Sequence, residues 1–360
     1  MKTLTVTFHH SHNYGALFQM FALHSKIKSM GHENLVLETE LDPSKRKNKS
    51  YNPKVILRNA YMYVCGKIRK KELQMLYKSF ADFKKNHVNF TVPYTSMDDL
   101  RNNPPDVDAM ITGSDQVWNM TTIPSMIPSR FLDFGNPDAI RFSYAASIEN
   151  MHYSEEQKEY AKEQLKKFKG ITLREKSACD FIESFSGLHT ESLLDPVFLF
   201  EKKEWNAIAK QPRIQGPYIL CYQVLSNKLM QKVVNKLQKD TGYPVVSICN
   251  VSFKWIRADY SFFDVSPEEF LGLYSNASYI VTTSFHGTAF GIIFNKKTYT
   301  IPRNISSNRI CDLMNLVGLE DYVVKSEKKL SNTSIDWDRV NLIIDGERNR
   351  AIQFLHQMIG

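Results

Sequence analysis

Short runs of apolar and β-branched residues alternate along this chain with stretches in which apolar residues recur every three or four positions. The runs are typical of buried strands, and the longer period is typical of helices that pack against them. Residues 279–283 form such a run, and apolar residues from Ala289 to Phe294 follow it at helical spacing. Because this succession of strand, polar turn and helix recurs in both halves of the chain, we predict an α/β fold.

The length of 360 residues exceeds what one hydrophobic core usually serves, so we expect two domains. Residues 202–217 are charged, weakly periodic and contain two prolines, which places the linker there. We predict an N-terminal domain at 1–205 and a C-terminal domain at 206–335. Asp336 is the expected cap of a last helix, 336–360, long enough at ~1.5 Å per residue to pack back on the N-terminal domain.

Polar residues follow several of the predicted strands. They are His9 to Ala16 after the first strand, Gly113 to Asn119 after a strand at 106–112, and Ser284 to Thr288 after the strand at 279–283. Ligands of open α/β sheets bind at the carboxyl ends of strands, and the first N–H groups of a helix favour anions. An ordinary capped turn explains Ser284 about as well, and Asp115 could cap a helix with Trp118 in the core. Arg174, between a short strand and a helix, either holds an anion or pairs with a nearby carboxylate.

His9, His10 and His12 invite a metal hypothesis. No carboxylate or cysteine is spaced along the chain to complete such a site, so we predict no metal centre. The five cysteines are scattered without a Cys-x-x-Cys pair, which argues against disulfides and zinc and for a reducing compartment. No apolar run approaches the ~18 residues of a membrane span, so the expected location is the cytoplasm.

The formal charge of +8 is concentrated in one region. Residues 45–85 contain thirteen Lys and Arg against Glu72 and Asp82, a net charge of +11 for that segment. Apolar residues from Leu73 to Phe83 recur there at helical spacing, so we expect a basic helical insertion at 45–100. Nucleic acid, an anionic membrane surface or a phosphorylated substrate could bind such a patch, and a solvated helix face needs no partner at all.

Six motifs in this order resemble the polysaccharide pyruvyl transferase family. They are Asn13-Tyr14-Gly15-Ala16 with Gln19, the run from Gly113 to Asn119, Tyr144-Ala145-Ala146-Ser147, Arg174-Glu175, Ser284-Phe285-His286-Gly287 and Ser307-Asn308-Arg309. The resemblance covers nearly the whole chain. It implies two Rossmann-like domains of the GT-B type with an interdomain cleft. It also implies transfer of a pyruvyl group from phosphoenolpyruvate to a sugar diol of a capsule, an exopolysaccharide or a lipid-linked precursor, as a cyclic ketal.

The resemblance also implies roles for residues. The chemistry needs a base for a sugar hydroxyl, an acid for the methylene carbon and charge for the departing phosphate; Asp115, as the base, and His286, which becomes cationic when the donor binds, are the catalytic candidates. Some family members carry an arginine where this chain has Ser284, so Arg303 or Arg309 is expected to supply the missing charge. The expected donor-binding residues are Arg174, Ser284, Gly287, Thr288, Arg303 and Arg309, and the expected acceptor-binding residues are Asn13, Tyr14, Gln19, Ser114, Gln116, Trp118 and Asn119. The acceptor is expected to be a galactose-type sugar, carried for instance on polyprenyl diphosphate, and no cofactor is expected beyond phosphoenolpyruvate as co-substrate.

Two other functions stay open. A GT-B glycosyltransferase would place the diphosphate of a nucleotide sugar at the helix start near Gly287, and fold alone does not separate the two enzymes. A non-catalytic glycan- or nucleic-acid-binding protein would explain the basic segment and Trp118, but not the polar turns at strand ends in both halves. We expect no nucleic-acid partner, and we expect contact between Lys67, Arg69, Lys70 and Lys71 and the anionic inner face of the membrane.

Overall fold

The computed structural model describes residues 1–39, 64, 66–120, 126–148, 151–224, 227–249, 256–302, 308–327 and 330–360. The chain forms two compact units, each of which contains more than one segment. The first unit comprises Met1–Lys45, Lys84–Phe200 and Leu342–Gly360, and the second comprises Arg46–Phe83 and Glu201–Asn341. The predicted domain limits and the predicted cleft between the domains stay predictions.

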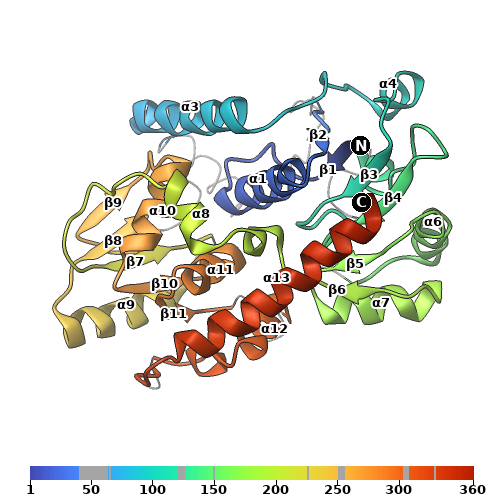
Figure 1. The fold of residues 1–360 in the computed structure, drawn as a ribbon. Helices are drawn as coiled ribbons and strands as arrows, with labels where there is room; N and C mark the ends of the chain where they lie inside the picture. The colour runs from blue at the N-terminus through green and yellow to red at the C-terminus, as the bar shows by residue number, and fades with distance from the viewer. Residues whose placement is uncertain are drawn as a thin grey trace. The chain divides into compact units, whose positions relative to one another are not determined.

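The first unit contains a parallel sheet in the order β2-β1-β3-β4. Its strands are β1 (Lys2–Val6), β2 (Glu33–Val36), β3 (Ala109–Thr112) and β4 (Ile140–Ser143). The short strands β5 (Thr172–Leu173) and β6 (Glu191–Ser192) pair in parallel, and a bridge between Ala146 and Leu173 joins them to the end of β4 (Figure 1). Because all these strands are parallel, the residues that follow them gather at one edge of the sheet.

Helices connect the strands of this unit. They are α1 (Tyr14–Ser29), α4 (Met97–Asn102), α5 (Ile127–Arg130), α6 (Glu155–Leu165), α7 (Lys176–Ser186) and the 3-10 helix η3 (Pro196–Leu199). Asn13 accepts hydrogen bonds from the first turn of α1, and Ser154 forms a capping box with Gln157, as these residue types favour at a helix start. The helix α13 (Trp337–Ile359) contributes Phe354 and Leu355 to the core around β3 and β4.

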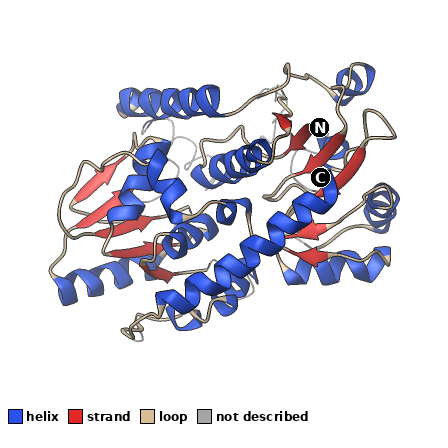
Figure 2. Cartoon of the chain, viewed as in Figure 1, coloured by secondary structure: helices blue, strands red, loops and turns tan. Residues whose placement is uncertain are grey.

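The second unit contains a parallel sheet in the order β11-β10-β7-β8-β9 (Figure 2). The strands are β7 (Ile219–Tyr222), β8 (Val245–Ile248), β9 (Tyr260–Phe262), β10 (Tyr279–Thr282) and β11 (Lys297–Thr300). The helices are α8 (Lys202–Ile208), α9 (Lys228–Thr241), α10 (Pro267–Asn276), α11 (Phe285–Ile293), α12 (Asn308–Leu316) and the 3-10 helix η4 (Glu320–Tyr322). The predicted α/β class is therefore confirmed, with a parallel sheet in each unit.

The predicted linker is wrong in its first half. Residues 202–208 form α8, although their composition is charged and weakly periodic. The backbone N–H of Glu201 donates to Glu204, 2.7 Å away, and the side chain of Trp205 is fully buried. Burial of this large aromatic side chain stabilises the short helix, and its Lys and Glu residues are themselves good helix formers.

The basic segment is described in part. Residues 45–63 and 65 of the predicted insertion lie outside the described residues, and α3 (Lys70–His87) follows them. Phe80 and Phe83 are buried on one side of α3, as the apolar spacing predicts. Across the described parts of the chain, no helix combines the length and the apolar character that a membrane span requires.

Candidate active site

A cluster of charged and hydroxyl side chains occupies the edge of the first unit's sheet, just beyond the ends of β3, β4 and β5. Ser114 and Asp115 follow β3, Ser147 lies in the turn after β4, and Arg174 and Glu175 follow β5. The parallel strand order brings these turns together, although up to 61 residues separate them in sequence. Polar turns that are distant in sequence therefore gather at the strand ends of this sheet.

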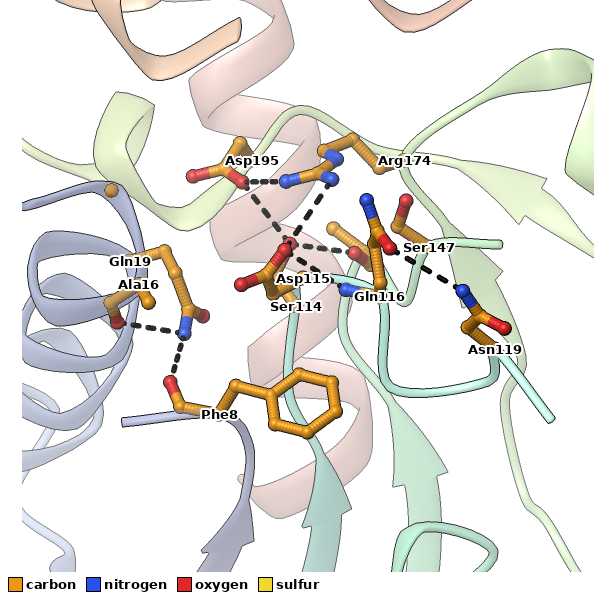
Figure 3. Close-up of polar contacts among 12 residues, drawn as sticks. Phe8, Ala16, Gln19, Ser114, Asp115, Gln116, Asn119, Ser147, Arg174 and Asp195 are labelled. Atoms are coloured by element: carbon orange, nitrogen blue, oxygen red, sulfur yellow. Dashed lines mark hydrogen bonds and ion pairs between the residues drawn. The ribbon is translucent and has the colours of Figure 1, made fainter. Parts of the chain in front are cut away.

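Arg174 connects the cluster. Its guanidinium donates to Asp195 Oδ2 at 2.7 Å and lies 4.0 Å from Asp115 Oδ1 (Figure 3). It also lies 3.9 Å from Glu175 Oε1. Ser114 Oγ donates to the same oxygen of Asp195 at 3.1 Å and contacts the carbonyl oxygen of Ala145 at 2.8 Å. One cation therefore faces three carboxylates.

The charges in the cluster keep Arg174 protonated. Burial by itself would lower the pKa of this guanidinium, but attraction to Asp195, Glu175 and Asp115 is larger in sum and raises the pKa. The Arg174 side chain is only 2% exposed. An incoming phosphate would meet a buried cation that three carboxylates already surround. The structure therefore supports the pairing alternative for Arg174 and not the predicted donor contact.

Asp115 differs from the other two carboxylates of the cluster. Its side chain is 23% exposed, whereas those of Asp195 and Glu175 are 0% and 2% exposed. Its backbone φ is 73°, a left-handed conformation that residues other than glycine seldom adopt. Strained backbone of this kind is concentrated at functional sites. Asp115 is thus the carboxylate of this cluster that a substrate can reach.

Hydrogen bonds hold the Asp115 turn in this conformation. The Asp115 carbonyl oxygen accepts from the N–H of Val117 at 2.7 Å and of Ser147 at 2.9 Å, and its carboxylate accepts from the N–H of Gln116 at 2.9 Å. Ser147 in turn donates to Glu175. The buried carboxylates and Arg174 therefore act as a support that orients one accessible carboxylate. Asp115 does not cap a helix, which was the alternative.

Trp118 is a core residue. Its side chain is fully buried, its indole N–H donates to the carbonyl oxygen of Arg130 at 3.0 Å, and its ring stacks on Phe131. The structure therefore supports the alternative of Trp118 in the core, and the expected contact of Trp118 with the acceptor receives no support. The amides of Gln116 and Asn119 approach each other at 3.5 Å in the same turn, and Asn119 is 5% exposed.

The turn between β1 and α1 is held by its own polar side chains. The Gln19 amide donates to the hydroxyl of Thr7 at 2.9 Å and to the carbonyl oxygens of Phe8 and Ala16, as Figure 3 shows for the last two. Asn13 accepts from the first N–H groups of α1, and Tyr14 is 7% exposed. These residues shape the turn, and their contact with an acceptor stays a prediction.

The turn between β10 and α11 is the corresponding polar turn of the second unit. Ser284 Oγ accepts the N–H of Gly287 at 3.2 Å and so caps α11, as the alternative for this turn supposed. The hydroxyl of Thr288 bonds to Ser284 O at 3.0 Å and to the Thr300 hydroxyl at 2.8 Å. Both side chains are thus engaged within the turn, and their donor contacts stay predictions.

Gly287 is required by packing. A Cβ at this position would lie 2.3 Å from the hydroxyl oxygen of Thr282 and 2.8 Å from that of Tyr274. The glycine allows α11 to approach β10 and α10 closely, which is a structural reason for it in the motif. A donor contact through its backbone stays a prediction.

His286 and Arg309 lie at the same edge of the second sheet. The strands β10 and β11 are parallel neighbours, so the first turns of α11 and α12, which follow them, open on one side. His286 is 8% exposed and its ring meets Phe285 edge to face. Arg303 lies outside the described residues. The expectation that Arg303 or Arg309 compensates for Ser284 stays a prediction.

The sequence reasoning missed Asp195 as a member of the first cluster. Its carboxylate is fully buried and bonds Arg174 and Ser114, which lie 21 and 81 residues away along the chain. In the sequence, Asp195 precedes a proline just after a short strand. That pattern is equally typical of an ordinary turn, so it does not by itself indicate a site residue. Asp195 does cap η3 by accepting the N–H of Val197, as the local pattern suggests. Its contacts with Arg174 and Ser114 depend on the tertiary structure.

Comparisons with known proteins identify the family of this chain. The sequence profile described as polysaccharide pyruvyl transferase matches residues 13–304. A comparison with curated protein sequences gives no significant match.

Among solved structures, the UDP-GlcNAc 2-epimerase of Methanocaldococcus jannaschii is similar, with a TM-score of 0.50, 9% identity, and coverage of 99% of this chain and 100% of that one. A putative UDP-N-acetylglucosamine 2-epimerase of Listeria monocytogenes has a TM-score of 0.49 and 8% identity, with coverage of 98% and 90%. A complex of S. aureus MnaA with UDP has a TM-score of 0.47 and 13% identity, also with coverage of 98% and 90%. At such identities the first of these likenesses supports the fold alone, a GT-B-like arrangement of α/β units. The family profile spans most of the chain, and the protein therefore belongs to the polysaccharide pyruvyl transferase family of enzymes.

Proposed function

We propose that the protein transfers a pyruvyl group from phosphoenolpyruvate to a sugar diol of a surface polysaccharide or of its lipid-linked precursor, forming a cyclic ketal. The observation that carries the proposal is Asp115, an accessible carboxylate held at strand ends by a buried cluster, in a chain of this family. A ketal requires removal of two hydroxyl protons, and a positioned carboxylate is suited to that task.

Asp115 acts as the general base in this proposal. The backbone N–H of Gln116 and the guanidinium of Arg174 fix its carboxylate, and its exposed part faces an incoming hydroxyl group. Asp195 and Glu175 hold Arg174 in place, so that the base is oriented before substrate binds. Arg174 is thus a positioning residue, which replaces the donor contact expected from the sequence.

His286 and Arg309 act on the donor side. Phosphoenolpyruvate carries a carboxylate and a phosphate, and arginine binds either of them through two parallel hydrogen bonds. The start of α11 adds a partial positive charge next to His286. Ser284, Gly287 and Thr288 shape that helix start, and Arg303 is a second candidate for donor charge.

The reaction balances without a cofactor. A proton is added to the methylene carbon of phosphoenolpyruvate, one acceptor oxygen bonds to the adjacent carbon, phosphate leaves, and the second acceptor oxygen closes the ring. Of the two hydroxyl protons, one ends on the new methyl group and the other on phosphate or in solvent. The departing phosphate is stabilised by fixed positive charges, so the reacting atoms require no metal ion.

We further propose a galactose-type acceptor, bound near Ser114, Gln116, Asn119 and the turn of Asn13, Tyr14 and Gln19. If the acceptor is carried on polyprenyl diphosphate, the enzyme works in the cytoplasm at the inner membrane face. Lys67, just before α3, and Lys70 and Lys71, at its start, would then hold the enzyme near anionic lipid.

The test is release of inorganic phosphate from phosphoenolpyruvate in the presence of a panel of galactosides and lipid-linked glycans. We expect release that depends on the acceptor, together with a pyruvylated product detected by mass spectrometry. Transfer of sugar from a nucleotide sugar, with no phosphate release from phosphoenolpyruvate, would instead identify a glycosyltransferase. Glycan binding without turnover of either donor would identify a non-catalytic protein.

A further inference from the structure

Two histidines and a carboxylate converge at the edge of the first unit's sheet, outside the Asp115 cluster. His9 and His10 follow β1, and Glu38 follows β2, its parallel neighbour. Glu38 Oε1 lies 3.4 Å from His10 Nδ1 and 4.0 Å from His9 Nε2, and the two imidazole rings are 4.0 Å apart between centroids. The three residues each offer a ligand atom, and these atoms lie within 4.8 Å of one another.

We propose that His9, His10 and Glu38 form a binding site for a divalent transition metal ion of the Zn²⁺ type. Two imidazoles and one carboxylate are a donor set that such ions prefer, and three protein ligands leave a tetrahedral ion one position for water or a ligand oxygen. With bonds of about 2.0–2.2 Å, neighbouring ligand atoms in a tetrahedral site are roughly 3.4 Å apart. The 3.4 Å distance between His10 Nδ1 and Glu38 already has this value.

The hydrogen bonds of His9 leave one nitrogen for the ion. Its Nε2 lies 3.1 Å from the carbonyl oxygen of Leu37, which can only accept, so Nε2 carries the hydrogen. The other nitrogen of the neutral ring, Nδ1, is then a bare lone pair and is the ligand atom of this proposal, whereas the 4.0 Å distance to Glu38 belongs to Nε2. Nδ1 is buried and has no hydrogen-bond partner among the described residues, and the His9 side chain is 0% exposed. A buried acceptor without a partner requires an explanation, and a metal ion supplies one.

His10 shows the same division between its two nitrogens. Its Nε2 lies 2.9 Å from the Thr39 hydroxyl, while Nδ1 faces Glu38. A metal-binding histidine ordinarily donates from its second nitrogen to an oxygen that fixes the ring. The Thr39 hydroxyl can accept from Nε2–H or donate to Nε2. In the tautomer in which Nε2–H donates to Thr39, the lone pair of Nδ1 faces a carboxylate oxygen, an arrangement that a cation between them stabilises. Lys84, which interacts electrostatically with His9, opposes the added charge and limits the affinity.

The surroundings of the cluster leave room for a ligand oxygen. A cavity of ≈30 Å³ next to it is lined by His10, Thr39, Thr7, Arg130 and their apolar neighbours, enough for a water molecule. The hydroxyl of Thr7 also donates to the carbonyl oxygen of Ser114 at 2.8 Å, which connects this cavity with the turn that carries Asp115. An ion in this place would lie on the acceptor side of the proposed reaction.

Along the chain, no carboxylate is spaced to complete a metal site with these histidines, and the sequence alone therefore predicts no metal centre. Glu38 is 28 residues from His10 and reaches it because β1 and β2 pair in parallel. The inference does not depend on pyruvyl transfer, because the proposed reaction needs no ion at the reacting atoms. Its test can therefore fail or succeed independently of the proposed function.

The test is titration of the full-length protein, stripped of metal by a chelator, with Zn²⁺ in a calorimeter and with Co²⁺ by visible absorption. We expect one equivalent to bind and Zn²⁺ to raise the midpoint of thermal unfolding. Glu38→Gln and His10→Ala should each weaken binding more than about 10-fold, since each removes a ligand. His12→Gln, which changes an exposed neighbouring histidine outside the cluster, should bind as the wild type does.

Circular dichroism of the metal-free variants is the control for folding. We expect both to fold, because Glu38 and His10 are partly exposed and their replacement should leave the core intact. Absence of one-to-one binding to the wild type would overturn the proposal and leave a His10–Glu38 ion pair as the account of the cluster. Equal weakening by His12→Gln would also overturn it, since the ion would then bind to surface histidines in general.

Discussion

Asp115 and Ala145 lie at neighbouring strand ends, and both have positive φ values, 73° and 48°. Each such residue costs roughly 1–3 kcal/mol of conformational energy, and it persists only where its surroundings impose the geometry. Here the turns impose it, since the carbonyl oxygen of Asp115 accepts two backbone N–H groups and that of Ala145 accepts the hydroxyl of Ser114. The strain at these residues therefore serves to direct one carboxylate toward solvent.

Asp115→Asn should separate donor binding from turnover. Asparagine keeps the size of the side chain and its contact with the Gln116 N–H, but it cannot accept a proton from the acceptor hydroxyl. We expect near-normal affinity for phosphoenolpyruvate in calorimetry and a rate lowered about 10²- to 10⁴-fold. Asp138→Asn, which changes an exposed carboxylate of the same unit, is the matched control and should leave both unchanged.

His286→Gln should reduce the affinity for phosphoenolpyruvate and the turnover rate together. Glutamine retains a hydrogen-bond donor but no positive charge, so the contact with the donor phosphate weakens in the ground state and in the transition state. Calorimetry with phosphoenolpyruvate and steady-state rates of phosphate release measure the two effects. If the Asp115 and His286 variants bind the donor equally well, or if Asp115→Asn retains most of its turnover, the proposed division between base and donor contact is wrong.

At the scale of single elements, α3 and the residues just before it combine lysines with exposed apolar side chains. Lys67, Lys70 and Lys71 are exposed, and Ile68 and Met75 are 75% and 58% exposed. A cationic surface with apolar side chains is the composition of a helix that lies on an anionic membrane.

Arg69 differs from the lysines around it. Its guanidinium lies 2.9 Å from Glu72 and stacks 3.5 Å above the ring of Phe263, so it is engaged within the second unit. The contact with lipid expected for Arg69 therefore receives no support, and the lysines carry that expectation alone.

Replacing Lys67, Lys70 and Lys71 together by Gln should weaken binding to vesicles that contain anionic lipid. Each lysine near the surface contributes roughly 1 kcal/mol at low ionic strength, so the loss should be large in co-sedimentation at low salt and small at high salt. Lys232, Lys236 and Lys239 are exposed on α9 of the same unit, and their replacement by Gln is the control. Equal losses in the two triple variants, or none in the first, would contradict a specific membrane face.

At the scale of the whole molecule, neither unit is one continuous stretch of sequence. The first unit takes its last segment, Leu342–Gly360, from the far end of the chain. That segment completes the core of the unit, because Phe354, Leu355 and Met358 pack with Ala109 of β3 and with β4. Without Leu342–Gly360, the other segments of the first unit lack part of their hydrophobic core.

Leu355→Ala tests this dependence. Leu355 is fully buried, so its truncation should lower the free energy of unfolding by about 2–5 kcal/mol, from lost burial and the cavity left behind. Leu342→Ala, at a position 74% exposed in the same helix, should change it by less than about 0.5 kcal/mol. Urea unfolding followed by circular dichroism measures both. Similar values for the two variants would mean that α13 is not part of this core.

Local features of the sequence predicted the elements and their caps. Alternating apolar patterns indicated the strands and helices, and Asn13, Ser154 and Ser284 cap the helices that follow them. These features depend on contacts within a few residues along the chain, which is why a single sequence contains them. The order of motifs also indicated the family, and with it the class of enzyme.

Only the tertiary structure decided which side chains meet. Arg174 could have held an anion, but Asp195, 21 residues away, binds it within a buried cluster. Trp118 could have faced a sugar, but it packs in the core. Glu38 joins His10 across two parallel strands. Pairing between distant segments is set by strand order and burial, and no local pattern in the sequence records it.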